Sequence, residues 1–390
     1  MGCYSRRSLP STLRGEKTLR LVPALLALAS LGAFCPRETR RPGASAPEAE
    51  IALAPLSVEL SEPGGYFDTD NLISNETPYL QVADQLAASA PTGGVYVGVG
   101  PDQNFSYIAR VRPRYAFIVD IRRQNMLQHL LFSALFAQAD DPYQYLCRLF
   151  SRSCPSVTPE GALPGVERTL RALEPQKPSE AAFAANLDAV YRHVESTLGF
   201  SLRSRDRLDI RNIYRAFFDE QAEIRFRTFG RSSGTYHPTY RTLLLARSPS
   251  GRFGSFLDSP EDYAFVRDLS RAQRIVPVVG DFGGPHALRA IGGWVRAHGL
   301  TVSAFYTSNV EFYLMRNRAF ATFVANLREL PSQPESVLIR SCFDYGRSHP
   351  AEIPGNRSVL LLQRLPRFLE LYDAGAYTTD WDVCTADYLR

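Results

Sequence analysis

Gly93-Gly94-Val95-Tyr96-Val97-Gly98-Val99-Gly100 is the stretch that decides the fold. Its β-branched centre ends in glycines and is followed by a helical pattern around Phe105, which predicts a strand, a tight turn and a helix. A second apolar run, Tyr115 to Val119, ends at Asp120 and leads into a long helix from about Arg122 to Ala137. Unbroken hydrophobicity of this kind is typical of parallel strands that are buried on both faces.

The same alternation returns in the last third of the chain. Expected strands cover 275–279, 301–306, 336–340 and 358–362, with helices at 285–297 and 317–327. Repeated strand and helix pairs predict an α/β fold with a doubly wound, mainly parallel, Rossmann-like sheet. Residues 139–260 have no strong strand signal and predict a helical insertion.

The N-terminus has the layout of a signal peptide. Basic residues precede the apolar run from Leu21 to Phe34, which Cys35 follows. This run is short for a bilayer, which needs roughly 20 residues, so no permanent membrane span is expected. Export and an unprocessed extension both stay open. Lipidation of Cys35 would place the bulky Phe34 where a small residue is preferred.

These signals predict five segments along the chain. They are a leader at 1–35, a Pro/Ala-rich linker at 36–65, the first part of the Rossmann-like domain at 66–138, the insertion at 139–260 and the second part at 261–390. Of the formal charge of +4, residues 1–41 hold eight basic and two acidic groups, which leaves the remainder at −2. A nucleic-acid-binding domain usually carries a basic excess, so no nucleic-acid partner is indicated.

The cysteines leave the compartment open. Outside the leader there are four, Cys147, Cys154, Cys342 and Cys384, and four cysteines allow three pairings. Cys147 and Cys154 suit a bridge only if the helix between them breaks, and free buried thiols are an equal alternative. No His/Cys cluster has the spacing of a zinc site, so no metal is expected.

Candidate ligand contacts follow the ends of the first three expected strands, because ligands of open parallel sheets bind beyond the carboxyl ends of the strands. The glycine turn would bring a ligand close to the backbone, a carboxylate after the second strand would accept ribose hydroxyl protons, and an acid beside an aromatic ring would suit adenine. These residues are Gly98, Gly100, Asp102, Asp120, Asp281 and Phe282.

The motifs VGVGPDQN (97–104), FIVDIRRQN (117–125) and VVGDFGG (278–284) resemble those of class I S-adenosylmethionine-dependent methyltransferases. The resemblance covers roughly 94–125 and 275–345, and it implies S-adenosylmethionine as cofactor and a small-molecule or protein methyl acceptor of unknown identity. The whole also looks like an uncharacterised bacterial family of this fold, which supplies no activity.

The chain departs from that pattern in two places. Many members have an acid where this chain has Tyr96 and a third glycine where it has Asp102. A NAD site fits less well, because its GxGxxG pattern would need glycine at Gln103.

Catalytic residues have no strong signature. Asn309 and Glu311 follow the fourth strand, where methyltransferases place the acceptor, and they could orient or deprotonate it or simply cap the next helix. His286 follows GDFGGP near the expected crevice mouth, where a proton acceptor or an exposed cap are both possible. His129 reads as a hydrogen-bonded core histidine. Arg122 and Arg123 would pair with acids, bind a carboxylated substrate or remain solvated.

Two functions therefore compete. The first is a methyltransferase that holds the cofactor with the residues above, while the insertion covers the crevice. The second is an exported, non-catalytic binding or structural protein on a degenerate methyltransferase-like scaffold. The signal-peptide-like leader favours the second function, and a Cys342–Cys384 disulfide would also favour it.

Overall fold

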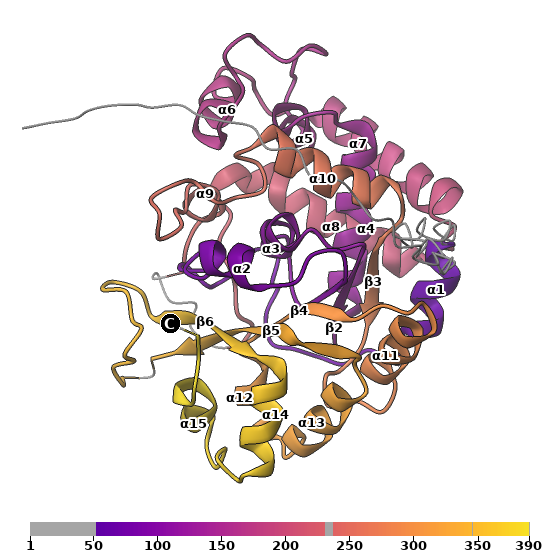
Figure 1. Cartoon of the computed structure of the whole chain (residues 1–390). Coiled ribbons are helices and arrows are strands. Elements are labelled where there is room, and N and C mark those ends of the chain that lie inside the picture. The colour runs from indigo at the N-terminus through magenta and orange to yellow at the C-terminus, as the bar shows by residue number, and fades with distance from the viewer. Residues whose placement is uncertain (1–51, 231–236, 345, 390) are drawn as a thin grey trace, which may run out of the picture. The chain divides into compact units, whose positions relative to one another are not determined.

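The computed structural model describes residues 52–230, 237–344 and 346–389, which form an α/β unit around a six-stranded sheet (Figure 1). Most strand ranges match the apolar runs of the sequence within two residues, but the strand expected at 336–340 extends from Ser332 to Phe343. The strands at Tyr115–Asp120 and Ile275–Val279 are buried along their whole length. The strands are β1 (Val95–Gly98), β2 (Tyr115–Asp120), β3 (Ile275–Val279), β4 (Val302–Ser308), β5 (Ser332–Phe343) and β6 (Ser358–Arg364).

The strand order in the sheet is β3-β2-β1-β4-β5-β6. The pairings from β3 through β5 are parallel, and only β6 runs antiparallel to its neighbour. The mixed α/β class and the mainly parallel sheet are thus confirmed. The chain builds outward from β1 in one direction and then from β4 in the other, so the order reverses between these two central strands.

Helices cover both faces of the sheet (Figure 1), which explains why its strands β1, β2 and β3 are mainly apolar. One face carries α2 (Ala83–Ser89), α3 (Gln103–Val111), α4 (Arg123–Gln138) and α10 (Pro260–Arg271). The other carries α11 (Ala287–Ala297), α12 (Val310–Arg316), α13 (Phe320–Arg328), α14 (Leu365–Asp373) and α15 (Asp380–Thr385).

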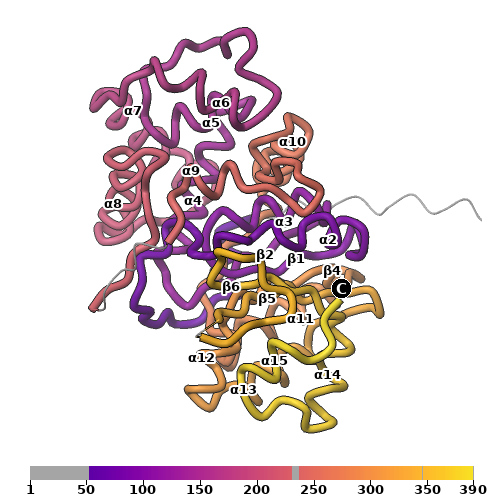
Figure 2. Tube along the Cα trace, turned by 90° about the vertical axis from the view of Figure 1, so that its left-hand side faces the viewer, coloured from indigo at the N-terminus to yellow at the C-terminus, as the bar shows by residue number. Residues whose placement is uncertain are grey.

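The predicted insertion is helical where the structure describes it, and it packs on the far side of α4 from the sheet (Figure 2). Helix α4 is consequently buried along most of its length. The insertion comprises α5 (Pro142–Leu149), α6 (Val166–Leu173), α7 (Glu180–Arg192), a π-helical turn (His193–Thr197), α8 (Ser204–Glu220), a 3₁₀ turn (Gln221–Glu223) and α9 (Tyr240–Leu244).

The predicted linker at 36–65 is wrong at its C-terminal end. Helix α1 (Leu53–Leu60) lies inside it, buries Leu53 and Leu60, and packs against β3 and α11. Its Ser57 hydroxyl donates to the Pro277 carbonyl at 2.5 Å. The sequence did not indicate this helix, because the surrounding segment is rich in Pro and Ala and the apolar residues of the helix span only two turns.

Two further helices differ from expectation. The sequence predicts a helix that Ser74 or Asn75 caps and that continues through Tyr79, Val82 and Leu86 at helical spacing. The helix begins only at Ala83, because Pro78 disfavours helical geometry at the residue before it. The short helix α12 was not predicted, and it lies directly after β4.

No helix in the described ranges has the length and apolar character to cross a membrane. The leader, its apolar run and Cys35 lie outside these residues.

Candidate functional site

A cavity of about 670 Å³ lies at the carboxyl ends of the parallel strands. Five strands contribute to its wall, through Gly100, Asp120, Gly280, Ser308 and Phe343 at or just beyond their last residues. This is the edge at which open α/β sheets bind ligands, and the reversal of strand order between β1 and β4 falls within it. Its volume suits an organic ligand of cofactor size.

Distant parts of the sequence close this cavity. The segment from Tyr66 to Asn75 runs along one side and pairs with the insertion, where the Phe229 N–H donates to the Asp68 carbonyl at 2.7 Å. The ring of Phe67 meets the ring of Tyr313 in α12 edge-on, with centroids 4.9 Å apart. The cavity is therefore an assembly of the sheet edge, the N-terminal segment, the insertion and α12.

The glycine turn after β1 divides into a half that packs against side chains and a half that lines the cavity. A Cβ at Gly98 would stand 2.0 Å from Asn104 Oδ1, and the Tyr96 hydroxyl donates to that same oxygen at 2.8 Å. Gly98 and Tyr96 therefore serve the packing of the turn. Gly100, with φ of +83°, lines the cavity, and its carbonyl lies 2.9 Å from His129 Nε2.

His129 is the hydrogen-bonded core histidine that the sequence indicated. Its side chain is buried in α4, and that burial lowers its pKa to about 4. It therefore stays neutral near pH 7 and supports the turn from behind.

Asp102 does not line the cavity. It is buried and accepts a hydrogen bond from the Tyr240 hydroxyl of the insertion. Burial raises the pKa of Asp102 to about 6, and the hydrogen bond from Tyr240 opposes that rise. The carboxyl that stands in place of the third glycine thus anchors the insertion to the start of α3.

Asp120 lines the cavity, but Arg122 occupies much of its carboxylate. Oδ1 accepts from the backbone N–H of Arg122 at 2.8 Å and from its Nε at 3.2 Å, and Oδ2 accepts from its Nη2 at 3.1 Å. A carboxylate offers about four acceptor positions, so one remains on Oδ2. Arg123 instead pairs with Asp206 of α8 at 2.7 Å.

Asp281 and Phe282 both line the cavity, but they differ in how much of each side chain other contacts already occupy. Asp281 Oδ1 accepts the N–H of Gly283 at 2.8 Å. The ring of Phe282 stacks on Phe323 and meets Phe305 edge-on, so most of its surface belongs to the core. The structure thus brings Gly100, Asp120, Asp281 and Phe282 together around one space.

Glu62 was missed by the sequence reasoning, and it binds next to Asp281. Its carboxylate accepts the backbone N–H groups of Asp281 at 2.8 Å and of His286 at 2.9 Å, at the start of α11. A carboxylate at a helix N-terminus satisfies N–H groups that otherwise lack partners. His286 is exposed, contacts the Glu59 carbonyl through Nε2 at 2.8 Å and does not line the cavity.

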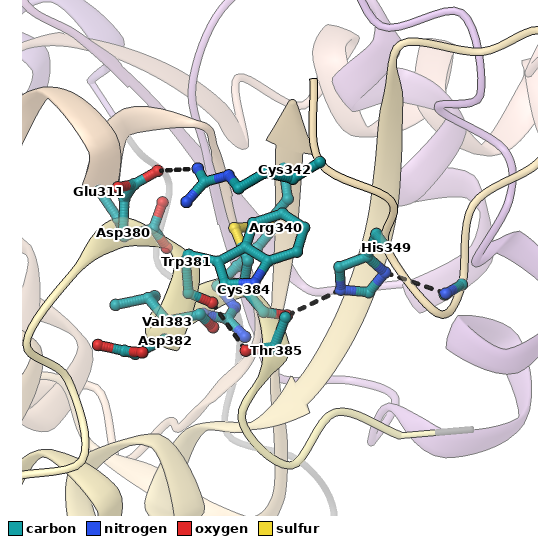
Figure 3. Close-up of a disulfide and its surroundings, with 12 residues drawn as sticks. Glu311, Arg340, Cys342, His349, Asp380, Trp381, Asp382, Val383, Cys384 and Thr385 are labelled. Carbon is teal, nitrogen blue, oxygen red and sulfur yellow. Dashed lines mark hydrogen bonds and ion pairs between the residues drawn. A yellow bond between two sulfur atoms is a disulfide. The ribbon is translucent and has the colours of Figure 1, made fainter. Parts of the chain in front are cut away.

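Of the two candidate catalytic residues after β4, only one lies at the cavity. Asn309 lines the cavity, whereas Glu311 is 5% exposed, points away and accepts the Thr307 hydroxyl at 2.7 Å. Glu311 lies beside the fully buried Arg340, whose Nη1 donates to the Val383 carbonyl at 2.6 Å (Figure 3). Burial raises the pKa of Glu311, and the Arg340 charge opposes this. Glu311 therefore cannot reach a ligand in the cavity.

A second buried carboxyl, Glu76, lies behind the cavity wall. Ser308 Oγ donates to its Oε1 at 2.5 Å, and the Tyr306 hydroxyl donates to its Oε2 at 2.7 Å. Tyr306 in turn accepts from Gln103 Nε2 at 3.2 Å. Burial raises the pKa of Glu76, and hydrogen bonds from the hydroxyls of Ser308, Tyr306 and Ser341 oppose the rise. The sequence offered one signal, a lone acid within an otherwise uncharged turn before α2.

Both pairs of cysteines outside the leader form disulfides. Cys147 joins Cys154, where α5 ends at Leu149 and the helix breaks as such a bridge requires. Cys342 at the end of β5 joins Cys384 in α15, next to the Arg340 site (Figure 3). Among the described residues no cluster of three or more His, Cys, Asp or Glu side chains could hold a metal ion.

Comparison with known proteins gives a family but no activity. The model of the family described as "Domain of unknown function (DUF7790)" matches residues 71–198 and 207–373, which include both halves of the sheet and most of the insertion. No functionally curated protein matches the chain. The chain is a member of the DUF7790 domain family.

Proposed function

We propose that this protein is an S-adenosylmethionine-dependent methyltransferase with a doubly wound, Rossmann-like sheet. The observation that carries the proposal is the cavity at the carboxyl edge, which gathers Gly100, Asp120 and Asp281 from three different strand ends. The strand order, with an antiparallel strand at one edge, supports the same fold class.

The residues present leave room for such a cofactor. Asp120 keeps one acceptor position on Oδ2, which suits a ribose hydroxyl. Asp281 accepts the Gly283 N–H at 2.8 Å on Oδ1, which leaves Oδ2 as an acceptor toward the cavity. Gly100 has no side chain between the turn and the cavity. Asp102 and Gly98 take no part, because their surroundings are filled by Tyr240 and Asn104.

When bound, the cofactor would supply an electrophilic methyl group on a sulfonium sulfur. The protein's task is then mainly to align the acceptor with that methyl group, which requires few acid–base groups. The segment from Tyr66 to Asn75 and the insertion would exclude water from the cavity.

The test is calorimetric titration of the full chain with S-adenosylmethionine, S-adenosylhomocysteine and NAD. We expect saturable binding of the first two and weaker or no binding of NAD. Asp120→Asn removes the ribose contact, and the affinity should fall about tenfold or more, the size of a hydrogen bond to a charged group.

The matched control is Asp206→Asn, which disturbs the neighbouring Arg123 pair but lies outside the cavity wall. It should leave the affinity for S-adenosylmethionine unchanged. Equal losses in both variants would mean that Asp120 acts through stability alone, and absence of binding by the unaltered chain would refute the proposal.

The second candidate, an exported binding protein without catalysis, is favoured by the two disulfides. Disulfides persist in oxidising compartments, where no supply of S-adenosylmethionine is evident. Mass spectrometry of the protein from its native source decides between the two. A mature N-terminus near residue 35 with no free thiols supports export, and an intact N-terminus with four reduced cysteines after the leader supports the enzyme.

A further inference from the structure

Ser308 has an unusual backbone conformation at a prominent position. It is the last residue of β4, one of the two central strands where the order reverses, and it lines the cavity. Its φ is +55°, in the left-handed region that residues other than glycine, asparagine and aspartate seldom adopt. Such conformations concentrate at functional sites, where the surrounding structure holds them.

The side chain of Ser308 is fixed by Glu76. The 2.5 Å hydrogen bond from its hydroxyl ends on a carboxyl that is 0% exposed. In the described part of the chain Glu76 has no ion pair, and the polar groups around its carboxyl are the hydroxyls of Ser308, Tyr306 and Ser341. Burying a carboxylate without a cation costs desolvation free energy. The position of Glu76 beside the cavity therefore suggests a role in the function of the site.

The direction of these hydrogen bonds determines what the cavity wall can recognise. Tyr306 donates to Glu76 and accepts from Gln103, and it does not line the cavity. Ser308 uses its single proton on Glu76, with Asn309 Oδ1 as a longer alternative at 3.4 Å. When Ser308 gives its proton to Glu76, its oxygen has only acceptor positions left to offer a ligand in the cavity that it lines.

We propose that Ser308 and Glu76 receive a proton-bearing group of the methyl acceptor, so that the acceptor is an alcohol or an amine. Ser308 contacts the acceptor, and Glu76 is a positioning residue that acts through it. This inference rests on the proposed methyltransferase function, because it assigns the substrate class of the same cavity.

The proton has a complete path. The acceptor's O–H or N–H proton passes to Ser308 Oγ as the serine's own proton passes to Glu76, and the acceptor atom keeps the electron pair of that bond. This pair forms the new bond to the methyl carbon while the carbon–sulfur bond of the sulfonium breaks and leaves a neutral thioether. A base near such a transfer works best when its pKa lies close to the ambient pH, and burial moves Glu76 in that direction.

The other titratable groups near Glu76 also favour proton uptake. Glu311 on α12 adds a like charge, and the hydroxyls of Tyr96 on β1 and Tyr107 on α3 remain neutral because burial raises the pKa of each. None of these groups supplies a positive charge that would hold Glu76 ionised.

The experiment compares two ligands of the full chain by calorimetry. One is S-adenosylhomocysteine, and the other is its analogue with an amino group in place of the sulfonium methyl, which offers N–H donors at the reaction centre. We expect the amine analogue to bind about tenfold to a hundredfold more tightly. Ser308→Ala and Glu76→Gln should abolish this preference, and so should Ser308→Gly, which suits the left-handed backbone.

Thr307→Val is the matched control. The Thr307 hydroxyl also donates to a buried carboxyl, Glu311, at 2.7 Å, but on the opposite face of β4. This variant should keep the preference for the amine analogue. In the unaltered chain the preference should also decline on acidification, as Glu76 gains a proton, and Glu76→Gln should remove that dependence.

Each outcome has one meaning. A preference that survives in the Ser308 and Glu76 variants, or that disappears equally in Thr307→Val, overturns the inference while the proposed function stands. If S-adenosylhomocysteine itself does not bind, the proposed function fails, and the assignment of the acceptor class fails with it.

Discussion

Glu76 and Glu311 are two buried carboxyls that β4 holds through consecutive hydroxyls, yet their surroundings differ. Ser308 donates to Glu76 and Thr307 donates to Glu311, on opposite faces of the strand. Glu311 lies beside the Arg340 guanidinium and away from the cavity, whereas Glu76 forms no ion pair with any residue that the structure describes and lies behind the cavity wall. A compensated charge is typical of structure, and an uncompensated one beside a cavity indicates function.

The largest effect should come from removing the compensation. Arg340→Met leaves Glu311 buried without its cation, and we expect the free energy of unfolding at pH 7 to fall by about 3–5 kcal/mol. Urea denaturation measures this. Adding Glu311→Gln to Arg340→Met should recover much of the loss, and a double variant as unstable as the single one would show that Arg340 matters for packing rather than charge.

A somewhat smaller effect should follow from opening the disulfide next to that pair. Cys342→Ser with Cys384→Ser releases α15, whose Val383 carbonyl accepts from Arg340, across a sequence separation of 42 residues. We expect a loss of about 2–4 kcal/mol, measured by thermal or urea denaturation under non-reducing conditions. The Cys147–Cys154 bridge closes a separation of only 7 residues, so Cys147→Ser with Cys154→Ser should cost less.

The smallest effect concerns the pH dependence of Glu76. Because burial raises its pKa in the folded state above the usual 4.5, the folded chain binds the extra proton and stability falls as the pH rises through the window above 4.5. Glu76→Gln should remove a slope of at most about 1.4 kcal/mol per pH unit. Urea midpoints between pH 4.5 and 8 measure the slope.

Glu311→Gln provides the contrast in the same experiment, because the Arg340 charge opposes the effect of burial on Glu311. The slope of stability against pH that Glu311→Gln removes should therefore be smaller than the slope that Glu76→Gln removes. Equal slopes in the two variants would remove the distinction between the compensated and the uncompensated carboxyl.

The sheet could be predicted from sequence because its signals are local. The runs at 95–98, 115–119 and 275–279 contain no charged side chain, since helices cover both faces of each strand. The positions of Gly100, Asp120 and Asp281 followed from strand ends, which the structure brings to one cavity. Whether an acid at such a strand end can still bind a ligand depends on the hydrogen bonds that it already accepts. Arg122, two residues after Asp120, takes up most of the acceptor positions of the Asp120 carboxylate.

The residues that were missed depend on contacts between distant segments. Glu76 meets Ser308 across 232 positions, and Glu62 meets His286 across 224. Neither acid belongs to a periodic pattern or a motif, so composition and spacing could not identify them. The same reasoning explains Asp102, whose partner Tyr240 lies 138 positions away in the insertion.

The pairing of the Tyr66–Asn75 segment with the insertion has a consequence for motion. It depends on a short isolated bridge between Thr69 and Thr228, outside any regular strand, while the sheet below it is fully paired. Local openings of a fold follow its least protected contacts, so the cavity should open by separation of this bridge long before the sheet unfolds. The amides of Asp70 and Phe229, which bond across it, would then exchange with solvent far sooner than those of β2. We expect a ligand to enter the cavity through the same opening.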